Sequence, residues 1–175
     1  AEALHCAQLP RGVPVVVRNA VERRALLEEG FRRVVVGGLP FAYVSQQHRS
    51  RHPHALLAIP PHSAEVERLT SQQQDYMDYL ESIRDEFDGV YISIFHLDWD
   101  GPMHRAALAR GLRALPGARP DDANSLARTR ALFDAFDQVT SNTIGSHFAY
   151  ALHADCRFSF CGPMFTYDED MLLGN

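Results

Sequence analysis

Residues 90–100, VYISIFHLDWD, decide the fold class that this chain is expected to adopt. The first six residues are apolar at both alternating sets of positions apart from Ser93, so an extended strand here has no face suited to water. Strands buried on both faces occur in parallel sheets that helices cover on either side. The polar run HLDWD then ends the apolar stretch. The segment therefore predicts an internal strand of a parallel sheet, with polar side chains at its carboxyl end.

The segments around this strand alternate between strand and helix patterns. A strand is expected at 55–63 and a helix at 70–89, which Thr70 or Ser71 caps. Downstream, the patterns predict a helix, a loop, a helix, a strand, a helix and a strand, at 102–115, 116–124, 125–138, 139–142, from Ile144, and at 157–162. This alternation predicts an α/β fold with a Rossmann-like, doubly wound, mainly parallel sheet.

The first 45 residues have a βαβ-like pattern of their own. A strand at 13–19, a helix at 21–30 that ends at Gly30, and a strand at 32–40 follow one another. We interpret 1–45 as the remnant of an N-terminal domain or a link to one, 46–54 as an exposed linker, and 55–175 as the Rossmann-like domain. The chain begins without Met and ends in DEDMLLGN, which suggests a piece of a longer protein.

Composition excludes several classes of protein. The 175 residues are 46% apolar, and the formal net charge of −5 argues against a general binder of duplex nucleic acid. The three cysteines show no CxxC spacing, which favours a reducing compartment and a cytoplasmic location. No apolar run is long enough to span a membrane, so we expect no membrane span. Peripheral association with a membrane stays possible.

Three expected strands end in polar clusters. These clusters contain His62 and Ser63, His96 and Asp98, and the residues from Asn142 to His147. Carboxyl ends of parallel strands share one edge of a sheet, where ligands of doubly wound folds bind. The three clusters are therefore expected to line one cleft. The alternative is that each is an ordinary helix cap, where Ser, Thr, Asn and Asp are also common.

The stretch TSNTIGSH, residues 140–147, has the composition of a phosphate-binding turn. Gly145 allows close approach to the backbone, and Thr143 and Ser146 offer hydroxyl donors at the positive end of a helix. The stretch lacks the GxGxxG and GxxxxGK[ST] patterns, so neither a dinucleotide cofactor nor a P-loop nucleotide is expected. A helix cap without a ligand remains the alternative.

The run HLDWDGPMH, residues 96–104, contains four potential metal ligands, His96, Asp98, Asp100 and His104. Metal sites usually draw ligands from more than one element, and no other segment shows a matching spacing. We interpret the run as a strand end followed by a capped helix, and we expect no metal and no other cofactor. His62, His96 and His147 lie at strand-to-helix junctions, where a base or a phosphate donor is commonly placed.

Four segments of the chain together resemble proteins of bacterial lipopolysaccharide and capsule loci, which look like GT-B glycosyltransferases. They are GFRRVVVGGLPFAYV at 30–44, LLAIPPHS at 56–63, DDANSLARTRALFDAFD at 121–137, and VTSNTIGSHFAYALHADCRFSFCGP at 139–163. The resemblance extends from about Val15 to Asp170. Such proteins transfer a sugar from a nucleotide-sugar donor to a saccharide or lipid-linked acceptor, in the biosynthesis of cell-surface polysaccharides.

The resemblance implies that residues 55–175 form the donor-binding half of such an enzyme. The residues that would line the phosphate and sugar are Ser141, Asn142, Thr143, Gly145, Ser146 and His147, with His62 and Ser63 across the cleft and His96 and Asp98 as an additional part of it. The catalytic base stays unassigned, because in these enzymes it often comes from an N-terminal domain that this chain mostly lacks. Two alternatives are a sugar-nucleotide epimerase of the same fold and a non-catalytic nucleotide- or carbohydrate-binding module.

Overall fold

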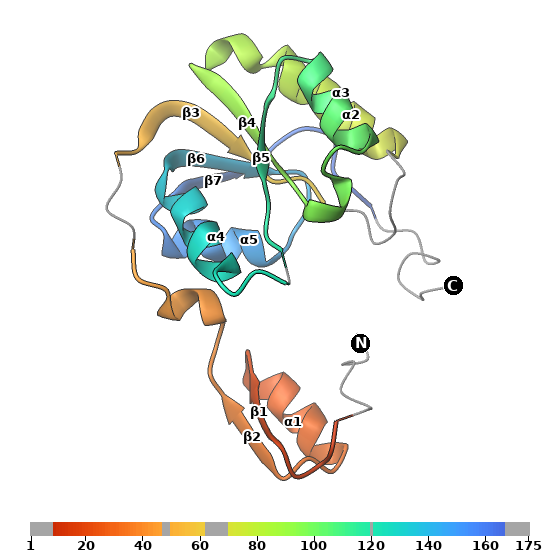
Figure 1. The fold of residues 1–175 in the computed structure, drawn as a ribbon, viewed down its shortest axis with the longest axis vertical. Coiled ribbons are helices and arrows are strands. Elements are labelled where there is room, and N and C mark those ends of the chain that lie inside the picture. Colours follow the sequence, from red (N-terminus) through yellow and green to blue (C-terminus); the bar gives the residue numbers. More distant parts are fainter. Residues whose placement is uncertain (1–8, 47–49, 62–69, 120, 167–175) are drawn as a thin grey trace. The chain divides into compact units, whose positions relative to one another are not determined.

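The structure is a computed structural model that describes residues 9–46, 50–61, 70–119 and 121–166 (Figure 1). The chain divides into two compact units, 1–43 and 44–175. None of the helices in the described ranges is both long and apolar enough to cross a membrane.

The first unit is a parallel βαβ motif. It consists of β1 (Pro14–Val17), α1 (Ala20–Glu28) and β2 (Arg33–Val36), followed by the 3-10 turn η1 (Pro40–Tyr43). The helix begins where the side chain of Asn19 accepts a hydrogen bond from the N–H of Glu22, and it packs on one face of the strand pair. The small core of the unit contains Val17, Leu26, Phe31 and Val34.

The second unit alternates strands with helices over its whole length. Its elements are β3 (His52–Ala58), α2 (Ser71–Ser82), η2 (Arg84–Glu86), β4 (Gly89–Ile94), η3 (His96–Asp98), α3 (Pro102–Ala109), β5 (Arg113–Pro116), α4 (Ser125–Asp134), β6 (Phe136–Ser141), α5 (Ser146–His153) and β7 (Arg157–Phe160).

The five strands of this unit form one sheet in the order β5-β4-β3-β6-β7, and every pair is parallel. From β3 the chain builds outward through β4 to β5, then crosses back and builds in the other direction through β6 to β7. The helices α2 and α3 cover one face of the sheet, and α4 and α5 cover the other (Figure 1). The direction of building reverses between β3 and β6, which is where ligands bind in sheets of this type.

The core explains why the central strands are apolar on both faces. Leu56 and Ala58 of β3 pack into a cluster with Tyr76 of α2 and Met103 of α3. Leu57 lies between them in the strand and is also fully buried. Because successive side chains of a strand alternate, Leu57 points to the opposite face, toward the α4 and α5 layer. The expected α/β fold with a parallel sheet is confirmed.

Several element boundaries differ from those expected, and one strand was missed. The segment 102–115 is not one helix: α3 ends at Ala109, Gly111 adopts a positive φ of 72°, and β5 follows. A left-handed residue at this position ends a helix, because the chain turns away from the axis. β3 begins at His52, so 52–54 of the expected linker belong to a strand. β6 begins at Phe136, and the preceding helix ends earlier than expected.

Candidate functional site

The candidate site is the carboxyl edge of the five-stranded sheet. Because neighbouring strands are parallel, the residues that follow them lie at one edge of the sheet. His96 follows β4 and Asn142 follows β6, on either side of β3. The structure therefore places these two polar clusters at the same edge, as expected. His62 and Ser63, which follow β3 in the sequence, lie outside the described residues.

The last residue of β6 and the residue after it hold this edge together. The Ser141 hydroxyl donates to the carbonyl of Ile59 beyond β3, at 2.6 Å, and accepts from the N–H of Thr143, at 3.2 Å. The amide of Asn142 donates to the carbonyl of Pro163 at 2.9 Å. Both side chains are fully buried. Their hydrogen bonds therefore join the turn to β3 and to the segment after β7.

In the side-chain amide of Asn142, the nitrogen has a hydrogen-bond partner and the oxygen, within the described part of the chain, has none. Its Oδ1 is buried and has no hydrogen-bond partner among the described residues. A buried polar atom without a partner costs about 1–3 kcal/mol, so it usually finds water or a ligand. Asn142 is therefore an expected site residue whose buried acceptor is unsatisfied at this edge.

The residues that follow present the start of α5 to solvent. Ile144, Gly145 and Ser146 are exposed, and α5 begins at Ser146, where none of the described side chains accepts a capping hydrogen bond. The starts of α3 and α4 likewise have no side-chain cap from the described residues, whereas Thr70 and Gln73 form a complete capping box at the start of α2. Backbone N–H groups at an uncapped helix start, together with the helix dipole, favour an anion.

His147 folds back onto the same turn. Its Nε2 lies 3.0 Å from the carbonyl oxygen of Thr143, which can only accept, so Nε2 donates the proton. Burial lowers the pKa of His147, and the hydrogen bond to Thr143 opposes this shift. The imidazole is thus kept neutral near pH 7, and Nδ1 is an acceptor in that state.

Residues of the run HLDWDGPMH, 96–104, contact one another. Nδ1 of His104 accepts from the N–H of Asp100 at 3.1 Å, and its ring stacks on Trp99. Asp98 is buried in η3, and Nδ1 of His96 is a buried atom without a hydrogen-bond partner in the described part of the chain. Within that part, no three His, Cys, Asp or Glu side chains are placed to hold a metal ion.

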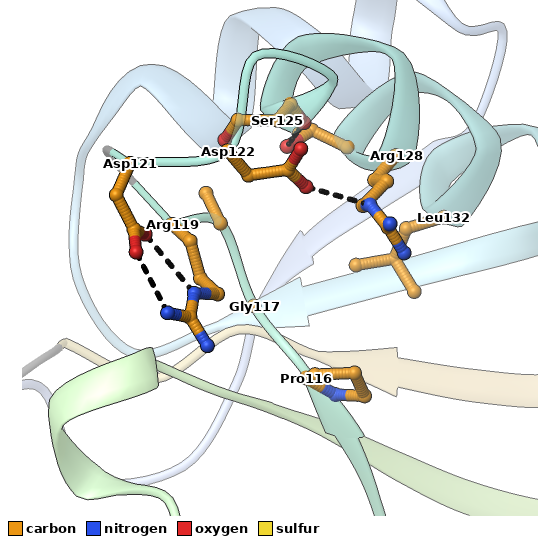
Figure 2. Close-up of a pocket in the computed structure, with 10 residues that line it drawn as sticks. Pro116, Gly117, Arg119, Asp121, Asp122, Ser125, Arg128 and Leu132 are labelled. Carbon is orange, nitrogen blue, oxygen red and sulfur yellow. Dashed lines mark hydrogen bonds and ion pairs between the residues drawn. The ribbon is translucent and has the colours of Figure 1, made fainter.

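A pocket of about 440 Å³ opens at the same edge, between the end of β5 and the first turns of α4 (Figure 2). Its lining combines small and apolar residues with two arginines, two aspartates and two hydroxyls: Pro116, Gly117, Ala118, Arg119, Asp121, Asp122, Ser125, Arg128, Thr129 and Leu132. The composition of 116–124 predicts a plain loop and does not indicate this pocket. The only signal was the DDAN run before α4, which is also typical of a helix cap.

Each arginine of the pocket is paired with an aspartate. Arg119 donates from Nε and Nη2 to the two oxygens of Asp121, at 3.0 and 2.8 Å. Arg128 lies 2.6 Å from Asp122, whose other oxygen accepts from the N–H of Asn124. The hydrogen bond from Arg119 lowers the pKa of Asp121, and the charge of His96 contributes in the same direction.

The structure thus brings His96, Asn142 and the start of α5 to one sheet edge and adds a pocket there that the sequence did not reveal. Comparisons of the chain with models of protein families, with curated proteins and with solved structures find no match. The function of this edge must therefore be inferred from its own residues.

Proposed function

We propose that the chain is a glycosyltransferase, or the donor-binding part of one, that acts in the biosynthesis of a cell-surface polysaccharide. In this proposal, the diphosphate of a nucleotide sugar binds at the start of α5, and the sugar lies toward the residues that follow β3. The resemblance of four segments to bacterial lipopolysaccharide and capsule proteins supports the class of enzyme.

The observation that carries the proposal is the uncapped, exposed start of α5. It lies after β6, where the order in which strands are added to the sheet reverses. Gly145 and Ser146 are exposed there, directly after a turn fixed by buried hydrogen bonds. The unsatisfied Oδ1 of Asn142 lies in the same turn. These features together favour a polar, anionic ligand over a plain helix cap.

The chemistry of such a site is the stabilisation of a leaving group. When the bond between the sugar and the diphosphate breaks, negative charge grows on the diphosphate oxygens. In this proposal, N–H groups at the start of α5 and the hydroxyl of Ser146 donate to that charge, and no metal ion takes part. No residue is assigned as the catalytic base.

The direct test is binding of nucleoside diphosphates and inorganic pyrophosphate to the full chain, measured by calorimetry with EDTA present. We expect pyrophosphate and at least one nucleoside diphosphate to bind, and to raise the melting temperature by mass action. Incubation with the corresponding nucleotide sugars then tests whether the chain releases the nucleoside diphosphate.

The outcomes separate the alternatives. Binding together with release of the nucleoside diphosphate supports a transferase. Binding with interconversion of the sugar, and without release, supports the epimerase. Binding without any change to the nucleotide sugar supports a non-catalytic module. Absence of binding by every diphosphate overturns the proposed site.

A further inference from the structure

The pocket between β5 and α4 has a composition that suits one kind of chemical group. Pro116, Ala118 and Leu132 supply apolar surface, and the Arg–Asp pairs flank the pocket as Figure 2 shows. Two positive and two negative charges balance within the lining, so the pocket does not select a phosphate. A flat ring with apolar faces and a polar edge fits such a lining, because its faces contact the apolar residues and its edge meets the charged groups.

The two ion pairs differ in how firmly they are held. The side chain of Asp122 is 20% exposed, and its oxygens are used by Arg128 and by the backbone at the start of α4. Asp121 is 65% exposed, and among the described residues it pairs with its near neighbour Arg119, itself 58% exposed. Exposed pairs of this kind contribute little to stability, so a contact between Asp121 and a ligand would disturb the fold little. Each of its oxygens also keeps a lone pair while Arg119 stays bound.

The group that best matches an ionised carboxylate is one with two adjacent N–H donors. Among the common nucleobases, only guanine presents an N1–H and an exocyclic N2–H side by side on one edge. Adenine, cytosine and uracil present an acceptor next to each donor, and a carboxylate repels that acceptor. The acceptors O6 and N7 on the other side of guanine are the usual partners of an arginine guanidinium.

We infer that the pocket between β5 and α4 binds the guanine base of a nucleotide, with the Asp121 carboxylate accepting from N1–H and N2–H. This inference rests on the proposed function, because it names the nucleotide whose diphosphate binds at the start of α5. Arg119 holds Asp121 ionised and remains beside the base, and the apolar residues of the pocket contact the ring faces.

Competition between nucleotides tests the inference on the full chain. We expect GDP to bind at least tenfold more tightly than ADP, CDP or UDP, because each good bidentate contact discriminates by about 1–3 kcal/mol. Inosine diphosphate, which lacks N2–H, should bind less tightly than GDP but retain the N1–H contact. Equal affinities for all of these diphosphates would overturn the inference and leave the proposed function standing.

The variant Asp121→Asn gives a sharper test, because it predicts a gain as well as a loss. An asparagine amide offers one donor and one acceptor, which matches the N1–H and C2 carbonyl of xanthine. Asp121→Asn should therefore weaken GDP binding by about tenfold or more and bind xanthosine diphosphate in preference to GDP. A variant that still prefers GDP would show that Asp121 does not contact the base.

The matched control is Asp85→Asn. Asp85 is an exposed aspartate paired with the adjacent Arg84, so the substitution removes a similar charge away from the pocket. It should leave the GDP affinity unchanged. Pyrophosphate affinity, measured on Asp121→Asn, separates the two proposals: it should stay at the wild-type value if the diphosphate site is independent of the base. If neither GDP nor pyrophosphate binds the wild type, both proposals fail together.

Discussion

His147 occupies the space beside Gly145: a β-carbon on Gly145 would lie 2.8 Å from two atoms of the imidazole ring. The backbone of Gly145 is extended, with φ of −161°, so any residue can adopt it. A glycine is needed here for the closeness of the ring and not for an unusual backbone conformation.

Gly145→Ala should therefore move His147 and break its hydrogen bond to Thr143. The ring is the far end of a side chain and can shift, so we expect the free energy of unfolding to fall by about 0.5–1.5 kcal/mol, the contribution of the lost hydrogen bond. Urea denaturation measures this change. In a His147→Ala background the same substitution should cost much less, because the obstacle is gone. Equal costs in both backgrounds would show that the two residues do not interact in this way.

Ser146→Ala tests the diphosphate site with little effect on folding. The hydroxyl is exposed at the first position of α5, so its removal should change the melting temperature only slightly. A donor to an ionised group contributes about 1.5–3 kcal/mol, so pyrophosphate affinity should fall tenfold or more. Ser71→Ala, at the exposed first position of α2, is the matched control. A lower melting temperature with unchanged affinity would instead make Ser146 part of an ordinary helix start.

Ser141→Ala, in contrast to Ser146→Ala, should lower the stability of the fold. The hydroxyl is fully buried, and its loss leaves the carbonyl of Ile59 and the N–H of Thr143 without their partner. We expect a loss of about 1–3 kcal/mol in the free energy of unfolding, measured by urea denaturation. Ser159→Ala, at an exposed position of β7, should change it far less. Similar effects at both positions would contradict the assigned role of Ser141.

The lowered pKa of His147 predicts a pH dependence of stability. In the unfolded chain His147 takes up a proton near its ordinary value of 6.5, whereas burial keeps it neutral to lower pH in the folded protein. The unfolded state therefore binds more protons in this window, and stability falls as the pH decreases below about 6.5. The contribution is fully present above that value. His147→Gln, which retains a donor, should flatten this part of a stability profile measured across the window, and an unchanged slope would argue against His147 as its source.

Divalent cations should not be required for binding of a nucleoside diphosphate. Asp100 and His104 contact one another, and no set of three potential ligands comes together in the described residues. We expect the same affinity with and without EDTA, and Asp100→Ala should not change it. Loss of binding in EDTA, reproduced by Asp98→Ala, would show that the HLDWD segment holds a metal ion.

The sequence predicted those elements whose own residues determine their secondary structure. It did not predict β5, which is a strand because it pairs with a neighbouring strand. The apolar run of β4 and the cap at Thr70 were sufficient for their elements. β5 is only four residues long and includes an arginine and a proline, and it is a strand because it pairs with β4. Nothing in its own sequence distinguishes it from the end of a helix.

The site was predictable only in part for a similar reason. The sequence indicated a polar turn after β6, but not how each side chain is used. Ser141 contacts a carbonyl 82 residues away and Asn142 one that is 21 residues away. The lining of the pocket comes from one stretch, 116–132, which forms a loop and the first turns of α4. Its charges face a common space because of the conformation of that loop, and the composition of 116–124 does not indicate this conformation.

The burial of residues 140–143 has a consequence for how tightly a ligand can bind. All four are almost inaccessible to water, and hydrogen bonds tie the turn to both neighbouring strands before any ligand arrives. The conformational entropy of this turn is therefore lost during folding and not during binding. A ligand at the start of α5 meets a preorganised surface, and even a modest number of contacts is converted efficiently into affinity.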